Sequence, residues 1–211
     1  MYTEQNKITN FSQGRILAAE IIYEVSEYKA YTNIALEKHL RNSKLPQVDK
    51  NLVTEIVNGT IRMIKHLDWV LNLFLKSDIK GANPWIRVIL RMGLYQILFM
   101  NKAPNYAVVN DAVELARKKT NHNLSKLING VLRNIIRNLD DIEYPKKATS
   151  NYLATYYSHP KWLVEKLLDN YTYSDLEQIL LYNNQRPRLH VRANTLKTRR
   201  DDLIDILGKE N

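Results

Sequence analysis

The segment NLSKLINGVLRNIIRNLD, residues 123–140, places its apolar residues at steps of three and four, which is the spacing of one face of an α-helix. On the other side of such a helix, Lys126, Arg133 and Arg137 are separated by seven and four residues and therefore share a face. We expect a helix that buries one side and exposes a basic side. The apolar side consists of Leu124, Leu127, Ile128, Val131, Leu132, Ile135, Ile136 and Leu139.

Helical periodicity continues through most of residues 1–140, with little of the alternation that strands show. The segment 84–99 is apolar nearly all round, which predicts a central buried helix that begins at Pro84. A helix that begins near Asp49 is expected to bend or break near His66. Together with the other amphipathic segments, the pattern predicts an all-α bundle of about seven helices with short joints.

Gly59 and Gly130 lie in two similar pentapeptides, Asn-Gly-Thr-Ile-Arg and Asn-Gly-Val-Leu-Arg, and both fall inside expected helices. A glycine in a helix interior costs about 1 kcal/mol relative to alanine. We therefore expect another helix to approach closely at both positions. A duplicated three-helix unit is an alternative interpretation of the repeat.

The character of the chain changes after Asp140. Residues 141–151 hold a proline, two lysines and small polar residues, which is typical of a linker. Residues 152–211 predict an α/β subdomain in the order helix-helix-strand-helix, with the strand over 189–194. One strand cannot satisfy its own backbone hydrogen bonds, so we expect its sheet partners beyond Asn211 and a truncated subdomain.

The net charge of +9 is unevenly distributed along the 211 residues. Residues 1–139 carry 20 Lys or Arg and 11 Asp or Glu, whereas residues 186–200 alone carry six cations and no acid. Such a basic block predicts a polyanionic partner, and a solvated surface that leans basic is the alternative. The basic block consists of Arg186, Arg188, Arg192, Lys197, Arg199 and Arg200.

The sequence contains no recognisable catalytic, cofactor or metal site. There is no cysteine, the six glycines are never closer than twelve residues apart, and no histidine pair has metal-ligand spacing. His190 could contact a phosphate or could simply be a surface residue. No apolar run approaches the roughly 18 residues of a membrane span, and residues 1–10 do not resemble a signal peptide, so we expect a cytoplasmic protein without a membrane partner.

Two stretches of the chain resemble two known families. Residues 1–140 resemble the NusB-like RNA-binding helical domain, through GLYQILFM, PNYAVVNDAVELARKK and LINGVLRNII. Residues 144–211 are similar to the start of the methyltransferase region of bacterial Sun/RsmB enzymes, through YSHPKWLVEKLLDNY and LHVRANTLKTRRDDLIDIL. This order is that of the 16S ribosomal RNA cytosine-C5 methyltransferases.

The resemblance implies the RNA-binding N-terminal portion of an S-adenosylmethionine-dependent enzyme. In that family a catalytic domain with the cofactor site and a cysteine nucleophile follows, and these residues contain neither. We therefore expect three units: a NusB-like domain over 1–140, a linker over 141–151 and a truncated methyltransferase subdomain over 152–211. The chain alone is then expected to transfer no methyl group and to bind no S-adenosylmethionine.

Small-subunit rRNA is the partner that the resemblance implies, and a protein partner of the NusB-like domain is a further one. We expect RNA contacts from the whole basic block, with a smaller contribution from Arg133 and Arg137. Arg192 and Asn194 fall in the family's Arg-Val-Asn-Thr-like motif, with Ala193 in the Val position. A free-standing NusB-like antitermination factor and a helical protein-interaction scaffold are the alternatives, but the former leaves residues 144–211 unexplained.

Overall fold

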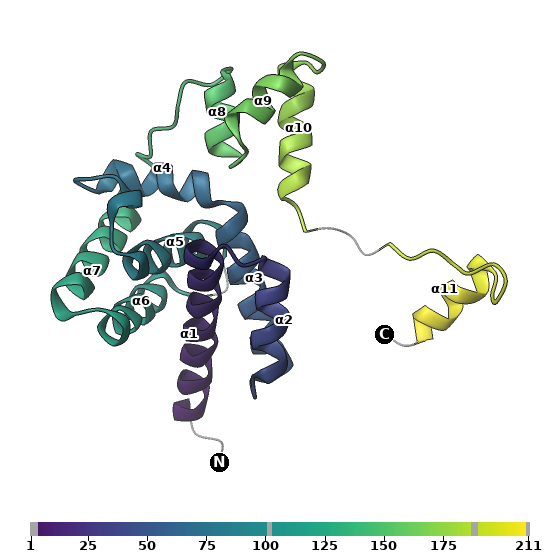
Figure 1. Ribbon diagram of the computed structural model, residues 1–211, viewed down its shortest axis with the longest axis horizontal. Coiled ribbons are helices and arrows are strands. Elements are labelled where there is room, and N and C mark those ends of the chain that lie inside the picture. The colour runs from purple at the N-terminus through teal and green to yellow at the C-terminus, as the bar shows by residue number, and fades with distance from the viewer. Residues whose placement is uncertain (1–3, 101–102, 187–189, 210–211) are drawn as a thin grey trace.

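The computed structural model describes residues 4–100, 103–186 and 190–209, with side chains described from Gln13 onward. The first part of the chain is a bundle of seven α-helices and one 3-10 helix, η1, shown in Figure 1, and the expected helical bundle is confirmed. The elements are α1 Glu4–Tyr28, α2 Thr32–Asn42, α3 Gln47–Arg62, α4 Ile64–Phe74, η1 Ile79–Gly81, α5 Pro84–Phe99, α6 Asn105–Lys119 and α7 His122–Arg137.

Helix α5 lies at the centre of the bundle. Pro84 occupies its first turn, and the side chain of Asn83 accepts a hydrogen bond from the Trp85 amide, which satisfies one free donor of the helix start. Helices α1, α3, α4, α6 and α7 all contact α5, so little of its surface meets water. The prediction of a central buried helix from its all-round apolar sequence is confirmed. Its fully buried residues include Val88, Ile89, Leu90 and Leu94.

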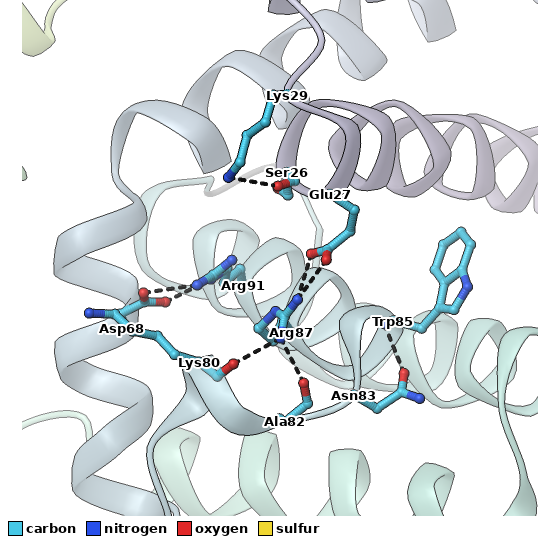
Figure 2. A network of polar contacts seen from close by, with 10 residues as sticks. All are labelled: Ser26, Glu27, Lys29, Asp68, Lys80, Ala82, Asn83, Trp85, Arg87 and Arg91. Carbon is cyan, nitrogen blue, oxygen red and sulfur yellow. Dashed lines mark hydrogen bonds and ion pairs between the residues drawn. The ribbon is translucent and has the colours of Figure 1, made fainter.

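Charged residues of α5 are paired with acids on neighbouring helices. Arg91 donates to both carboxylate oxygens of Asp68 at 2.7 and 2.9 Å, and Arg87 donates to both oxygens of Glu27 at 2.7 Å (Figure 2). Arg87 also donates to the carbonyls of Lys80 and Ala82 at 2.9 and 2.8 Å. The Arg91–Asp68 pair is bidentate and fixes direction as well as distance. Together with the bonds of Arg87 to Glu27 and to the two carbonyls, it holds α1, α4 and η1 in position on α5.

Three of the glycines in the α-helices of the bundle, Gly59, Gly93 and Gly130, differ in their surroundings. A Cβ on Gly59 would lie 1.9 Å from the ring of Tyr95, whose hydroxyl donates to Glu55 at 2.8 Å, so close packing at Gly59 is confirmed. A Cβ on Gly93 would approach Leu132 of α7 to 3.0 Å, a contact that the sequence analysis missed. The expectation for Gly130 is wrong, because Gly130 is exposed and no atom lies within 4 Å of an added Cβ.

A second, smaller unit follows the bundle. Helices α8 Ser150–Tyr156, α9 Lys161–Leu168 and α10 Tyr173–Asn184 share a separate apolar core. Tyr144, in the connection from α7, packs against both this core and the core of the bundle. The fully buried residues of the smaller core are Leu153, Val164, Leu176 and Leu180.

The second unit is attached at the break between α3 and α4. Met63 interrupts the two helices, three residues before the predicted break at His66. Ser158 has a positive φ of 58°, and its hydroxyl donates to the carbonyl of Arg62 at 2.7 Å and accepts from the amide of Lys65 at 3.1 Å. One side chain of the second unit therefore satisfies two backbone groups next to the break.

Four further hydrogen bonds beside this contact link the bundle to the second unit and to the connection that precedes it. The carbonyl of Tyr156 accepts from Nδ1 of the buried His66 at 2.7 Å, and Nε2 of His66 lies 3.1 Å from the Tyr144 hydroxyl. Trp69 Nε1 donates to the carbonyl of Glu143 at 2.9 Å. Arg62 donates to the carbonyl of Asn184, the last residue of α10, also at 2.9 Å. We call this set of contacts the junction.

The C-terminal part departs from the sequence prediction. Helix α11, Arg200–Lys209, forms as expected and stands apart from the other helices in Figure 1, with none of its described residues buried. The strand predicted over 189–194 is not formed across residues 190–194, and Leu189 lies outside the described residues. A strand needs a neighbour to bond its backbone, and the described part of the chain offers 190–194 none.

Alanine at the two pentapeptide glycines is expected to have opposite effects on the free energy of unfolding. Gly59→Ala forces a methyl group into the Tyr95 ring and should destabilise the chain by about 1–3 kcal/mol. Gly130→Ala adds a methyl group in open space and should stabilise it by about 1 kcal/mol. Urea unfolding followed by circular dichroism measures both, and wild-type stability of Gly59→Ala would contradict the packing described.

The domain boundaries at 140 and 151 remain a prediction, for which limited proteolysis is the test. Lys146 and Lys147 are exposed and lie outside any helix, whereas the lysines and arginines of α6 and α7 are held in helical backbone. Between the end of α7 and the start of α8, trypsin should therefore cut after Lys146 or Lys147, before it cuts inside α6 or α7, and leave a helical fragment. A first cut between residues 105 and 139, identified by mass spectrometry, would be the contrary result.

The junction should make stability depend on the charge of His66. Burial lowers the pKa of His66, so the folded chain holds it neutral at a pH where the unfolded chain, with a pKa of about 6.5, binds a proton. The free energy of unfolding should then fall as pH drops below about 6.5. His66→Gln removes this titration, and its stability should change less over the same pH range. If the free energy of unfolding changed equally with pH in the wild-type chain and in His66→Gln, the expectation would be contradicted.

Candidate nucleic-acid interface

The described members of the basic block are all exposed. Arg186 follows α10, and Arg192, Lys197, Arg199 and Arg200 precede or begin α11, whereas Arg188 lies outside the described residues. Within the described part of the chain, the block's one ion pair joins Arg200 to Asp201 at 3.3 Å, between side chains that are 82% and 87% exposed. A pair so exposed contributes little, so these cations keep their charge available to an anion.

A local turn shapes the middle of the block. The carbonyl of Asn194 accepts from the amides of Lys197 and Thr198 at 2.8 and 3.0 Å, and its side chain accepts from the Leu196 amide at 3.1 Å. Asparagine commonly makes such turns, because its short side chain can bond the backbone two residues on. The turn leaves the Leu196 side chain exposed. His190 is also exposed, at the start of this segment.

The second cation set lies on α7 as the sequence predicts. Lys126, Arg133 and Arg137 are exposed, and the buried side of the helix carries Ile128, Leu132 and Ile135. Asn129 accepts from Nε of Arg133 at 2.8 Å, which orients the guanidinium and leaves its two terminal nitrogens directed away from that bond. The described part of the chain shows no acid paired with these three cations.

A groove runs beside this face, between α6 and α7. Its cavity measures about 420 Å³, and Arg117 at its edge is paired with Glu114 one helical turn earlier. The sequence analysis missed the α6 side of the groove, because only the packing of α6 on α7 brings those residues beside Lys126. The lining residues are Asn110, Val113, Glu114, Arg117, Ser125, Lys126 and Asn129.

The structure does not bring the two cation sets together. The face of α7 belongs to the seven-helix bundle, whereas residues 190–200 follow α10 of the second unit (Figure 1). Arg15, a residue of the first helix, is buried and donates to Gln96 at 2.7 Å and to Asp111, so it holds α1, α5 and α6 together. Arg15 is therefore buried away from any RNA, and the exposed cations of α6 and α7 form one of the basic surfaces of the bundle.

The buried titratable groups have structural roles. Burial raises the pKa of Tyr144 to about 12, so its hydroxyl stays protonated and can donate to His66. Among the described residues, no three His, Cys, Asp or Glu side chains are placed to hold a metal ion. No helix in that part of the chain is long and apolar enough to cross a membrane.

Comparison with known proteins shows the family to which the chain belongs. Residues 12–137 match the NusB family, and residues 159–211 match the ferredoxin-like domain of the RsmF/B-like methyltransferases. The chain therefore belongs to the NusB family, and it carries a methyltransferase-associated domain behind the NusB domain. The resemblance that the sequence motifs indicated is confirmed for both parts.

Its relatives are named as rRNA methyltransferases. The probable ribosomal RNA small subunit methyltransferase B of Bacillus subtilis is 32% identical over 200 residues, which cover 93% of this chain and 44% of that protein. The corresponding protein of Synechocystis is 31% identical over 198 residues, with 94% and 44% covered. The chain thus spans less than half the length of these curated relatives.

Solved structures share the fold at low sequence identity. NusB in a complex of NusB and NusE with double-stranded RNA matches 62% of this chain and 97% of that chain, with a TM-score of 0.56 and 20% identity. The protein PH0851 matches 95% of this chain and 44% of that chain, with a TM-score of 0.62 and 18% identity. The first likeness fits the extent of the bundle alone, and the second extends over nearly the whole chain.

Proposed function

We propose that this chain is the RNA-binding portion of an S-adenosylmethionine-dependent rRNA cytosine-C5 methyltransferase. In this proposal the chain positions small-subunit rRNA for a catalytic domain that these 211 residues do not contain. The observation that carries it is the order of the two matched domains, NusB over 12–137 and RsmF/B-like over 159–211. The names of the relatives support the reaction class, and the two exposed cation sets support RNA as the ligand.

S-adenosylmethionine would supply the methyl group to the complete enzyme. The residues of this chain do not fit that cofactor, because the glycines are never closer than twelve residues apart and form no glycine-rich loop. The described part of the chain also shows no strand from which a nucleotide-binding sheet could be built. The chain's own contribution is therefore to bind and orient RNA.

The two cation sets are suited to different parts of that task. The basic block places five described cations within residues 186–200, which gives a high local charge for phosphates. The α7 set lies on a regular helix, and Asn129 fixes the direction of Arg133. Arginine binds phosphate through two parallel N–H groups, so an oriented guanidinium adds geometry to affinity. We propose that the block supplies most of the affinity for RNA and that the α7 set fixes the position of the RNA on the protein surface.

A protein partner of the bundle is a second proposal, and it rests on the NusB match. The solved NusB relative is in a complex with NusE and RNA, and the bundle here has the same fold. The matched ferredoxin-like domain over 159–211 favours the methyltransferase proposal over a free-standing antitermination factor.

Neutralising the basic block should weaken RNA binding more than neutralising the α7 set. One double variant carries Arg192→Gln and Arg199→Gln in the basic block, and the other carries Arg133→Gln and Arg137→Gln on α7. Each variant loses two positive charges. A small-subunit rRNA hairpin is titrated across a salt series. The log–log slope should fall by roughly 0.7–0.9 for each lost phosphate contact. A variant of Arg186, Arg188, Arg192, Arg199 and Arg200 together should lose the most.

One result would contradict the expectation that the basic block contributes more to RNA affinity than the α7 set. If neutralising Arg133 and Arg137 abolishes binding while the block variants keep wild-type affinity and slope, the block is not the main contact. Binding by neither the wild-type chain nor any variant would contradict the proposed function as a whole. Circular dichroism of each variant shows whether the helical fold is retained.

A further inference from the structure

Gly130 is an exposed glycine in the middle of α7, at a position where alanine would be the more stable choice. Gly59 and Gly93 are explained by close neighbours, Tyr95 and Leu132, but nothing lies within 4 Å of an added Cβ at Gly130. Packing within the chain therefore gives no reason for this glycine. A helix surface without a side chain lets another molecule approach the backbone closely.

The surroundings of Gly130 are basic and polar. Lys126 lies one turn before Gly130 on the exposed side of α7, and Arg133 lies one turn after it. The groove of about 420 Å³ opens beside them, with the amides of Asn110 and Asn129 in its lining. Among the exposed residues of α6 and α7 there is one acid, Glu114, and Arg117 pairs with it. The exposed cations of the two helices are Arg117, Lys118, Lys126, Arg133 and Arg137.

We propose that the groove between α6 and α7 holds one unpaired nucleotide of RNA, and that Gly130 is the point where the sugar–phosphate backbone crosses α7. The phosphates lie against Lys126 and the oriented guanidinium of Arg133. The base enters the groove, where the amides of Asn110 and Asn129 present hydrogen-bonding groups to its edge. This inference deepens the proposed function and rests on it.

The shape of the site selects unpaired RNA over a duplex. The base edges of a duplex are stacked and paired, whereas an unpaired base can leave the stack and enter a pocket on a protein surface. A cavity of about 420 Å³ lies within the range of small-ligand pockets, which are about 300–1,000 Å³. The polar side chains among the lining residues and the excess of cations nearby also fit a nucleotide better than an apolar partner surface.

The proposal gives Gly130→Ala two effects of opposite sign. The variant should melt at a higher temperature than the wild-type chain, since alanine favours the helix. It should also bind a short single-stranded oligoribonucleotide about tenfold more weakly, because the methyl group holds the RNA backbone away from α7. Gly130→Gln should weaken binding further. Gly81→Ala is the matched control, since it adds a methyl group in open space on η1, away from the groove.

Fluorescence anisotropy with the 211-residue chain measures these affinities, using the single strand and a fully paired RNA duplex of the same base composition. Selective loss of single-strand binding in both Gly130 variants, with Gly81→Ala unchanged, supports the proposal.

Single-strand affinity unchanged in Gly130→Ala and Gly130→Gln overturns the proposal and leaves the proposed function standing. Equal losses for both RNAs overturn the unpaired-nucleotide site. Displacement of the single strand by equimolar polyglutamate shows a general polyanion surface and also overturns it. No RNA binding by the wild-type chain overturns the proposed function instead.

Discussion

The arrangement of the two units depends on the hydroxyl of Ser158. It bridges the carbonyl of Arg62 and the amide of Lys65, backbone groups on either side of the break at Met63. Backbone groups next to a helix break lack partners within the helix, so the Ser158 hydroxyl that bonds them attaches the second unit at the break. The end of α10 is held nearby by Arg62, which places the start of the basic block relative to the bundle.

Sequence periodicity was sufficient to predict the helices but not every joint between them. The all-round apolar sequence of α5 indicated its central position, and the structure confirms it. The alternation over 189–194 indicated a strand, yet residues 190–194 form none, because strand formation requires a partner that local sequence does not reveal. The break at Met63 was predicted three residues too late, since the contact from Ser158 comes from distant sequence.

The sequence also predicted some features of the candidate site and not others. Charge density alone indicated the basic block, and helical spacing placed Lys126, Arg133 and Arg137 on one exposed face. Neither signal could show that Asn110 and Arg117 of α6 line a groove beside that face. The two similar pentapeptides suggested one role for Gly59 and Gly130, but only Gly59 meets a neighbour. A local motif cannot distinguish a glycine that packs inside the chain from one that faces outward.

The central claim, that the exposed cations of α6, α7 and the basic block receive RNA, is tested most directly by mapping the contacts. The chain is cross-linked to a small-subunit rRNA fragment by ultraviolet light, and the modified peptides are identified by mass spectrometry. We expect adducts in peptides from 106–137 and from 186–200, and their loss in competition with unlabelled RNA. Adducts confined to α2, α8 or α9, with these two regions unmodified, would contradict the account.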